Sequence, residues 1–582
     1  MTLGKVLYID LSKRRSWVED RSELFSDRLG GVGVAIKLLE EELPKGADPL
    51  GPDNVIVFAV GPLTGLYPMA SKTVALFKSP LTGNLGESHA GGRSAVAIRL
   101  TGYGAIVIKG ASESPIYLAI HNGRVFFRDA SGLWGVGSSL TVGRVIRERE
   151  PGAGVRTIMR IGRAGERLVR YACVNTETYR HFGRLGLGAV FGSKKLKAVV
   201  ISGKSSINVK DPASYRKVYD RIYEMATKTA LMRKYHDIGT SMNVQPLNTI
   251  RGLPTRNLKE ASFEEAHMIS GENLAENYLG RRVACSHCPV ACIHLAALRE
   301  PYEDEPYFYK TTMISYDYEL IYALGSMLGV SDPEGMLRLM NEVEVLGMDA
   351  ISTGVVLAWM TEAYERGVIS DDDTAGLKPR WGDWRVYLKA IRMIVEQPTE
   401  FYRDLAMGVA YAASKNGGED YALAFGGNEM PGYHTGPAAH LGFLTGARHS
   451  HLDSAGYSLD QRLLKKGLKP SVEKVVDYLI SEESWRQILS SLVVCYFARG
   501  IYRPEMVEEA LKPVGYSLDV EALRKLGLEI LRDKNRFKVR EGFNPEKLKP
   551  PKRIYETPTP LGHVDEKLME EAVKLFYERL AL

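Results

Sequence analysis

Cysteine is scarce in this chain: among 582 residues there are five, Cys173, Cys285, Cys288, Cys292 and Cys495. Three of them lie within one stretch of eight residues, a distribution that argues against a disulfide framework. Unpaired thiols in a chain of this length are typical of a reducing compartment, so we expect a cytoplasmic protein.

Long apolar runs are absent as well. No stretch reaches the length needed to cross a bilayer, and the residues after Met1 enter a strand-like pattern without an apolar signal region. A net charge of +6 is a weak bias for this length and does not indicate nucleic acid. We therefore expect a soluble, intracellular protein with no membrane span and no nucleic-acid partner.

Two common nucleotide-binding signatures are also missing: there is no G-x4-G-K-[ST] loop and no Rossmann fingerprint. The length predicts two to four domains, and the pattern changes along the chain. Residues 1–205 are β-rich, residues 206–415 are mainly helical, and a weaker boundary near 415 separates a second helical part, 416–582. The predicted fold class is α+β.

Short β-branched or apolar runs predict the strands of the first part. A hairpin signal, Asn122-Gly123, separates the last two runs. One helix is predicted from Gly33 to Leu43. The runs predicted as strands are Val6–Ile9, Val55–Phe58, Thr73–Phe77, Ala95–Ile98, Ala105–Ile108, Ile116–Ile120 and Arg124–Phe127.

Capping patterns predict helices in the remainder. Asp211-Pro212 and Asp332-Pro333 are typical of an N-cap followed by proline at the first helical position. Amphipathic helices are predicted over Ser352–Arg366 and Val564–Leu580. The stretch 300–318 mixes acidic and aromatic residues, including Glu303 and Asp304, and is either a solvated loop or a loop lining a site.

The clustered cysteines form a C-x2-C-x3-C motif, Cys285, Cys288 and Cys292. Thiolates at this spacing can surround one metal centre, and soft sulfur ligands select zinc, copper(I) or iron–sulfur clusters. His287 and His294 keep a zinc site open. A cubane cluster held by three local cysteines and one distant cysteine is the favoured interpretation.

Two glycine-rich stretches stand out in the β-rich part. The first runs from Ser79-Pro80-Leu81-Thr82-Gly83 to Ala90-Gly91-Gly92-Arg93, and the second from Ile161-Gly162-Arg163-Ala164-Gly165-Glu166 to the run 183–194, GRLGLGAVFGSK. Glycine lets backbone N–H groups approach an anion closely, and Lys and Arg add charge. Tight turns in a crowded sheet are the alternative explanation.

Taken together, these stretches and the cysteines resemble the aldehyde:ferredoxin oxidoreductase family of tungsten-bispterin enzymes. The resemblance covers nearly the whole chain and rests on several motifs in the same order. It implies an N-terminal double β-sheet domain that forms a base for two pterins, covered by two mainly helical domains. It also implies a tungsten (or molybdenum) bis-pterin cofactor, a [4Fe–4S] cluster and magnesium.

The resemblance assigns residues to these groups. Cys285, Cys288, Cys292 and Cys495 match the four cluster ligands. The family brackets its pterins with two D-x-x-G-L-[D/C] motifs. The first corresponds to Glu344-Val345-Leu346-Gly347-Met348-Asp349 here, and the second to Ser490-Ser491-Leu492-Val493-Val494-Cys495, which lacks the acid and the glycine. Further cofactor-binding candidates are Lys72, His89, Ala90, Gly91, Gly92, Arg93, Arg184, Leu185 and Gly186, some of them near the pterin phosphates and their magnesium.

Two positions match catalytic residues of the family. Glu319 corresponds to the active-site glutamate, which can take a proton, although it could instead cap the following helix. The run Arg448-His449-Ser450-His451-Leu452 matches the family's R-G-x-x-H-L with one residue fewer, so His451 is the better candidate and His449 the second. Such a histidine can orient a carbonyl oxygen, and a packing role is the alternative. Cys173 is expected to be a buried thiol.

The resemblance thus implies oxidation of an aldehyde to a carboxylic acid, with electrons passed to ferredoxin or to a small polyferredoxin subunit. A catalytic subunit of the tungsten benzoyl-CoA reductase type is the alternative within the family. A zinc or iron–sulfur protein without enzymatic activity is the alternative from another class, and it leaves the paired glycine motifs unexplained.

Overall fold

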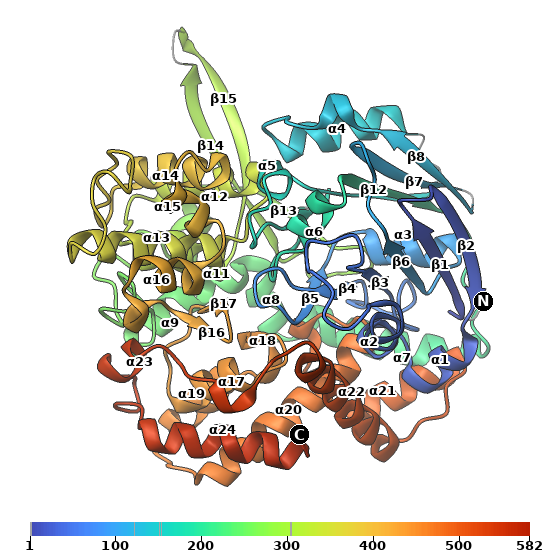
Figure 1. Ribbon diagram of the computed structural model, residues 1–582. Helices are drawn as coiled ribbons and strands as arrows, with labels where there is room; N and C mark the ends of the chain where they lie inside the picture. The colour runs from blue at the N-terminus through green and yellow to red at the C-terminus, as the bar shows by residue number, and fades with distance from the viewer. Residues whose placement is uncertain are drawn as a thin grey trace.

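The computed structural model describes residues 3–121, 123–150, 152, 154–177, 179–302 and 305–581, except for the side chain of residue 306. Asn122 of the predicted hairpin signal and the acidic residues Glu303 and Asp304 lie outside the described residues. Two six-stranded sheets and a larger set of helices make up the molecule (Figure 1). The predicted α+β class, with two sheets followed by helical regions, is confirmed.

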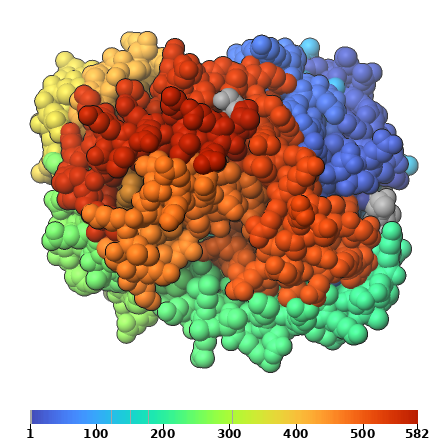
Figure 2. Space-filling view, turned by 90° about the horizontal axis from the view of Figure 1, so that it is seen from below, coloured from blue at the N-terminus to red at the C-terminus, as the bar shows by residue number. Residues whose placement is uncertain are grey.

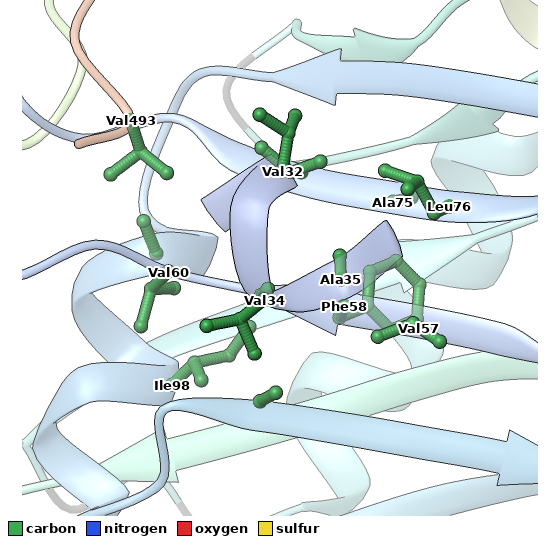
Figure 3. Close-up of a cluster of buried hydrophobic side chains, with 14 of the residues drawn as sticks. Val32, Val34, Ala35, Val57, Phe58, Val60, Ala75, Leu76, Ile98 and Val493 are labelled. Carbon is green, nitrogen blue, oxygen red and sulfur yellow. The ribbon is translucent and has the colours of Figure 1, made fainter. Parts of the chain in front are cut away.

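The first sheet has the order β2-β1-β6-β3-β4-β5, with β1 and β6 parallel and the other neighbours antiparallel. Helix α2 (Gly31–Glu42) packs against β3 and β4, because eight of its twelve residues, all of them apolar or glycine, are buried. Figure 3 shows Val32, Val34 and Ala35 of α2 near Val57, Phe58, Ala75 and Leu76. The strands are β1 (Lys5–Asp10), β2 (Arg15–Asp20), β3 (Ile56–Ala59), β4 (Thr73–Lys78), β5 (Leu85–Ala90) and β6 (Ala105–Lys109).

The second sheet has the order β11-β10-β9-β12-β7-β8. Helix α3 (Ser94–Thr101) follows the first sheet's β5 and packs on β9 and β12, so it joins the two sheets. The strands are β7 (Ile116–His121), β8 (Arg124–Asp129), β9 (Val155–Arg160), β10 (Val174–Asn175), β11 (His181–Phe182) and β12 (Leu196–Gly203), and the short helices of this part are α1 (Ser22–Arg28), α4 (Ser139–Arg149), α5 (Arg163–Glu166) and α6 (Leu187–Ser193).

The prediction of a strand over Ala95–Ile98 is wrong, because these residues lie within α3. Every residue from Ser94 to Arg99 is buried between the sheets. The sequence therefore shows an apolar run and lacks the periodic polar residues that mark a helix with one exposed face. A short buried run of this kind fits a strand or a helix equally well. The other predicted strands of this part are present.

From residue 206 onward the chain is mainly helical. Asp211 caps α7 and Asp332 caps α12, each accepting a backbone hydrogen bond as the sequence predicts. The principal helices are α7 (Pro212–Lys228), α8 (Ala230–Asp237), α9 (Val244–Thr249), α10 (Gly271–Asn277), α11 (Tyr318–Leu324), α12 (Pro333–Leu346), α13 (Ala350–Glu365), α14 (Trp384–Glu396), α15 (Glu400–Leu405), α16 (Val409–Asn416), α17 (Pro437–Thr445), α18 (His451–Ser454), α19 (Gly456–Lys466), α20 (Val472–Ser491), α21 (Pro504–Leu511), α22 (Val520–Arg540), α23 (Arg553–Glu556) and α24 (Glu566–Leu580).

The stretch 300–318 was predicted to be either a solvated loop or a loop lining a site, and it is instead mainly β-strand. Strands β14 (Ile293–Tyr302) and β15 (Glu305–Tyr316) form a long antiparallel hairpin, which joins β13 (Leu279–Val283) in a three-stranded sheet. Figure 1 shows the hairpin projecting from the body at the top of the view. Tyr307, near its far end, is 91% exposed. A second small sheet pairs β16 (Ala424–Phe425) with β17 (Asn428–Glu429).

The C-terminal helices pack against both earlier parts of the chain. One hydrophobic core contains the first sheet together with residues of α20, α21 and α22, and a second contains α11 to α17 together with α24. Figure 2 shows these helices, in orange and red, between the blue N-terminal part and the green segment that follows it. The domain boundaries near 205 and 415 stay predictions. No helix among the described residues is long and apolar enough to span a membrane.

Candidate active site

A cavity of about 360 Å³ lies where loops of the two sheets meet the helical parts. Its walls include the end of β5, the loop before α6, the first turn of α11, the ends of α12 and α20, and the start of α18. The predicted residues that line it are Lys72, His89, Gly91, Arg184, Leu185, Glu319, Glu344, Met348, Asp349, His451, Val494 and Cys495.

Two helix ends of the same geometry deliver four of these residues. At the end of α12, Met348 N–H donates to Val343 C=O and Gly347 N–H to Glu344 C=O. This pair of bonds defines a Schellman motif, with Gly347 in the left-handed region at φ +74°. The chain leaves the motif with Met348 and Asp349 facing the cavity.

The end of α20 repeats this arrangement with a different sequence. Val494 N–H donates to Leu489 C=O, and Val493 N–H donates to Ser490 C=O. Val493 takes the left-handed position at φ +54°, although it is β-branched. The motif that lost its acid and its glycine therefore keeps its backbone shape, and it delivers Val494 and Cys495 to the cavity.

Glu319 and His451 face each other inside the cavity. His451 Nε2 lies 3.1 Å from Glu319 Oε1, and Gly432 N–H donates to Glu319 Oε2 at 3.4 Å. Burial raises the pKa of Glu319 to about 8, with the negative charge of Asp317 adding to the effect. Burial also lowers the pKa of His451 well below its usual value. Both shifts favour the uncharged forms of the pair, a protonated carboxyl and a neutral imidazole.

Asp317 sets the position of Glu319. Its side chain caps α11 and accepts hydrogen bonds from the N–H groups of Glu319 and Leu320. Glu319 is thus the second residue of the helix and does not cap it. Its backbone is fixed by the cap while its carboxyl group points away from the turn into the cavity.

Aromatic side chains cover one side of this pair. Tyr433 stacks on Tyr457 with ring centroids 4.2 Å apart, and it lies 5.2 Å from the His451 ring. Tyr318 packs against Tyr433 at 5.0 Å. Tyrosine rings present large apolar surfaces, so this side of the cavity can hold an apolar group next to the carboxyl and the imidazole.

Arginine and carboxylate groups line the opposite side. Arg184 Nε donates to Asp349 Oδ2 at 3.1 Å, and its Nη2 donates to Glu429 C=O at 2.7 Å. Glu344 accepts from His181 at 2.5 Å. These contacts hold Arg184 and Glu344 in place, so that both can meet a bound group.

A buried charged cluster under the cavity was missed by sequence reasoning. Glu87 Oε2 lies 2.5 Å from Lys534 Nζ and its Oε1 lies 2.7 Å from His89 Nε2, while Arg448 stands 3.7 Å away. Burial alone would raise the pKa of Glu87, but the charges of Lys534 and Arg448 outweigh it and hold that pKa well below its usual value. No spacing in the sequence joins residues so far apart.

The four predicted ligand cysteines are neighbours in space. Burial raises the pKa of Cys288, and the other three thiols raise it further. Burial raises the pKa of Cys292 to about 11, against the opposing charge of Arg180. A Cβ atom on Gly91 would lie 2.8 Å from the Cys285 sulfur, so glycine at this position makes room for the thiol.

Met69 joins the two cysteine-bearing segments. Its N–H donates to His287 C=O and its C=O accepts from Cys495 N–H, both at 2.9 Å. Ser286 N–H donates to Gly92 C=O, also at 2.9 Å. Loops of the first sheet thus hold the C-x2-C-x3-C loop and Cys495 against each other.

The described residues contain no group of three or more His, Cys, Asp or Glu side chains placed to hold a single metal ion. The four thiols are near enough to affect the pKa of Cys288. His294, the zinc alternative's ligand, instead contacts the carbonyl groups of Cys292 and His236.

Several predicted residues lie outside the cavity wall. His449 is buried between Phe443 C=O and Lys538 Nζ, at 3.0 and 3.1 Å, away from Glu319. Arg93 is exposed and lines a separate cavity. Ala90, Gly92, Gly186 and Gly347 shape the backbone nearby without lining the cavity. Cys173, by contrast, lies on the cavity wall; it is buried and its thiol donates to Asn175.

Comparison with known proteins identifies the family of this chain. The family model described as the N-terminal domain of aldehyde ferredoxin oxidoreductase matches residues 6–203, and the model for domains 2 and 3 matches residues 216–581. Tungsten-containing aldehyde ferredoxin oxidoreductases of Thermococcus kodakarensis and Pyrococcus furiosus are 32% and 30% identical, each over 96% of this chain and 92% of the relative.

A further relative and a solved structure extend the comparison. The WOR-like subunit of an aliphatic sulfonate oxidoreductase of Pyrococcus furiosus is 32% identical over 68% of this chain and 64% of its own length. The active-site complex of a benzoyl coenzyme A reductase with 1,5-dienoyl-CoA has the same fold, with a TM-score of 0.84 and 23% identity over 100% of this chain and 94% of that chain. The chain belongs to the aldehyde ferredoxin oxidoreductase family and is an oxidoreductase.

Proposed function

We propose that this protein oxidises an aldehyde to a carboxylic acid and passes the electrons to a ferredoxin-type protein. The reaction is RCHO + H₂O → RCOOH + 2 e⁻ + 2 H⁺. The observation that carries the proposal is the Glu319–His451 pair, which places a proton-accepting group and a hydrogen-bonding group 3.1 Å apart at one end of an otherwise protected cavity.

The cavity has the properties of a site for a polar cofactor. Five residues on its wall carry buried polar atoms with no hydrogen-bond partner among the described residues: Arg180 Nε, Arg184 Nη1, Glu344 Oε1, Asn428 Oδ1 and His451 Nδ1. Leaving such atoms unpaired costs about 1–3 kcal/mol each, so a bound group with many donors and acceptors would satisfy them. A bis-pterin cofactor carrying tungsten, as in the named relatives, fits this requirement.

The proposed holding residues follow the predicted assignments. Arg184, Glu344, Met348, Asp349 and Val494 would contact the two pterins. The segment around His89 and the backbone at Arg184-Leu185 would meet their phosphates and magnesium. Cys285, Cys288, Cys292 and Cys495 would hold a [4Fe–4S] cluster, and Lys72 would lie beside it, because a Gly91 Cβ would meet both Cys285 Sγ at 2.8 Å and Lys72 Nζ at 3.4 Å. A bound tungsten cofactor would supply two-electron redox chemistry, and a bound cluster would supply one-electron transfer.

The residues of the chain handle the substrate and its protons. In its ionised form Glu319 takes a proton from the attacking water. His451 Nε2 holds the aldehyde oxygen by a hydrogen bond while Tyr433 and Tyr457 cover the apolar part of the substrate. The aromatic cover keeps bulk water from the reacting group, which strengthens both polar contacts.

The cavity volume bears on the alternative, an enzyme of the benzoyl-CoA reductase type. A space of about 360 Å³ is at the small end of ligand pockets and has to take the reacting part of the substrate beside the cofactor. This favours an aldehyde over a coenzyme A thioester. The structural neighbour of that type shares the fold, and its substrate is not transferred to this chain.

Elemental analysis and a dye assay test the proposal. We expect one tungsten and four irons per chain in the purified enzyme, together with aldehyde-dependent reduction of a viologen dye. Stoichiometric zinc without iron would contradict the cluster assignment. An enzyme with full tungsten and iron content that fails to reduce the dye with every aldehyde tested would contradict the assignment of an aldehyde substrate.

A further inference from the structure

A second cavity, of about 460 Å³, lies on the other side of the cysteine loop and is lined by five arginines. They are Arg93, Arg144, Arg147, Arg156 and Arg160. Glu177 is the one acidic residue on its wall, and its Oε2 is occupied by Thr157 and the N–H of Ile158. The cavity is therefore strongly positive. We refer to it as the arginine cavity.

Two of the arginines are held by hydrogen bonds on the inner wall of the cavity, which we call its floor, and the other three are exposed, at what we call its rim. Arg160 is buried, and its Nε donates to Ser139 C=O at 2.7 Å. Arg156 Nη1 donates to Glu150 C=O at 2.5 Å. Arg93, Arg144 and Arg147 are exposed, and their guanidinium groups form no hydrogen bond or ion pair with any described residue, although the Arg147 carbonyl group accepts from Arg156 Nη1. Three unpaired guanidinium groups at one rim repel one another unless an anion joins them.

Two glycines keep the floor open. A Cβ on Gly143 would lie 2.7 Å from Arg160 Nε, and a Cβ on Gly152 would lie 2.8 Å from Arg156 Cζ. Side chains there would displace the guanidinium groups from the wall. Glycine at these two positions therefore leaves room for the guanidinium groups of Arg160 and Arg156.

The arginine cavity adjoins the loop that carries three of the proposed cluster ligands. Ser286, which follows Cys285, lines the arginine cavity, and its N–H donates to Gly92 C=O one residue before Arg93. The loop itself reaches the surface, since Ala284 and His287 are exposed. A molecule seated in the arginine cavity would touch the loop that carries three of the four cysteines.

Arg281 and Arg282 directly precede the cysteine loop, and Arg299 follows it. Arg282 donates to the carbonyl groups of His236 and Asp237, and Arg299 lies over the Tyr309 ring at 4.4 Å. Both are engaged within the chain. Among the described residues, the positive charge beside the cysteine loop that no side-chain contact engages belongs to Arg281, to Arg93 and to Arg144 and Arg147 of α4.

We propose that the arginine cavity is the docking site for an acidic iron–sulfur protein, whose carboxylate groups join Arg93, Arg144 and Arg147 above the cysteine loop. This rests on the proposed function, since it places the electron acceptor at the proposed cluster. Each encounter moves one electron from the cluster to the partner, so two encounters follow each aldehyde oxidised. Opposite charges at the rim raise the association rate, and salt removes that gain.

The test is the double variant R144E/R147E, compared with K567E/K574E on α24. Both change the net charge equally, and Figure 1 places α24 at the opposite end of the molecule from α4. Aldehyde oxidation is measured with an acidic ferredoxin and with a small viologen dye. Binding of the ferredoxin to the enzyme is measured directly by calorimetry at low and high salt.

We expect R144E/R147E to lower kcat/KM for ferredoxin about 10-fold at low salt and to weaken binding by a similar factor. The dye rate should stay within twofold, and K567E/K574E should behave like wild type in every assay. If R144E/R147E also lowers the rate with the dye, the substitutions have damaged the fold. If R144E/R147E binds ferredoxin as the wild type does, the arginine cavity is not the docking site. A changed molecular mass in solution would identify a second copy as the occupant and overturn the proposal. Failure of the wild type with both acceptors would instead reject the proposed function.

Discussion

At the scale of single residues, the environment of Glu319 sets a pH dependence. Its pKa is raised to about 8, and the ionised form is the one that accepts a proton. We therefore expect kcat/KM to rise with pH through about 8. Glu319→Gln should lower kcat about 10²-fold or more and abolish this rise. Measurements of the pH–rate profile with a viologen dye, at equal tungsten content, test both effects.

The two histidines provide the control for this prediction. His451→Ala should impair turnover much more than His449→Ala, because His449 contacts Lys538 and Phe443 away from Glu319. The opposite ranking would mean that the histidine facing the substrate has been misassigned.

A second prediction separates the helix cap from its charge. Asp317→Asn keeps an N-cap side chain but removes the negative charge that helps to raise the pKa of Glu319. The rise of kcat/KM should then move to lower pH while the enzyme stays folded. Asp332→Asn changes the cap of α12 in the same way and should leave the profile unmoved. A profile unchanged in both variants would show that Asp317 acts only as a cap.

Sequence reasoning identified individual residues of the site and ranked His451 above His449, but it could not show how these residues meet in space. It identified Glu319 and both histidines, yet only packing shows that His451 faces Glu319 while His449 faces Lys538. Glu87 carries no signal in the sequence, because its role depends on Lys534 and Arg448 from distant segments. Arg93 follows a glycine motif but lines the other cavity.

At the scale of elements, the two matching helix ends yield a prediction about strain. Val493 sits at φ +54°, where a residue other than glycine costs about 1–2 kcal/mol. Its side chain is also buried in the first core, and Figure 3 shows it above the start of α2. Removing the buried side chain loses more packing free energy than the relief of backbone strain restores. Val493→Gly and Val493→Ala should therefore both have a lower free energy of unfolding than the wild type.

The order of the two variants is the informative measurement. Val493→Ala loses the packing and keeps the strain, whereas Val493→Gly loses the packing and relieves it. Val493→Gly should therefore be more stable than Val493→Ala by about 1 kcal/mol, the reverse of the usual helix preference. Thermal denaturation at matched cofactor content measures this. An alanine variant more stable than the glycine variant would exclude the strained helix end.

Elements with clear local signals were predictable, including strands such as β4 and β7 that are buried on both faces, whereas α3 and the hairpin β14–β15 were not. Capped helices such as α7 and α12 begin at the predicted residues because their signals are local. Helix α3 was mistaken for a strand because it is buried on all sides. The hairpin β14–β15 was taken for a loop because its exposed aromatic and acidic residues give no alternation of buried and exposed faces.

At the scale of the whole molecule, the site exists only where distant parts of the chain meet. Met69 of the first part bonds to both His287 and Cys495, and Arg448 and Lys534 surround Glu87. The resemblance to a known family supplied this arrangement in advance, whereas composition and periodicity gave the order of β-rich and helical parts without their contacts.

This convergence leads to the last prediction. Cys495 comes from the end of α20 and its three proposed co-ligands from the loop before β14, so a cluster bound by all four ties these segments together. Cys495→Ser should alter the electron paramagnetic resonance signal of the reduced cluster and lower the melting temperature, since ligand binding to the folded state adds stability. Cys173→Ser is the matched control, because serine can still donate to Asn175. If the two variants give the same signal and the same melting temperature, Cys495 is not a ligand, and the parts of the molecule are held by protein contacts alone.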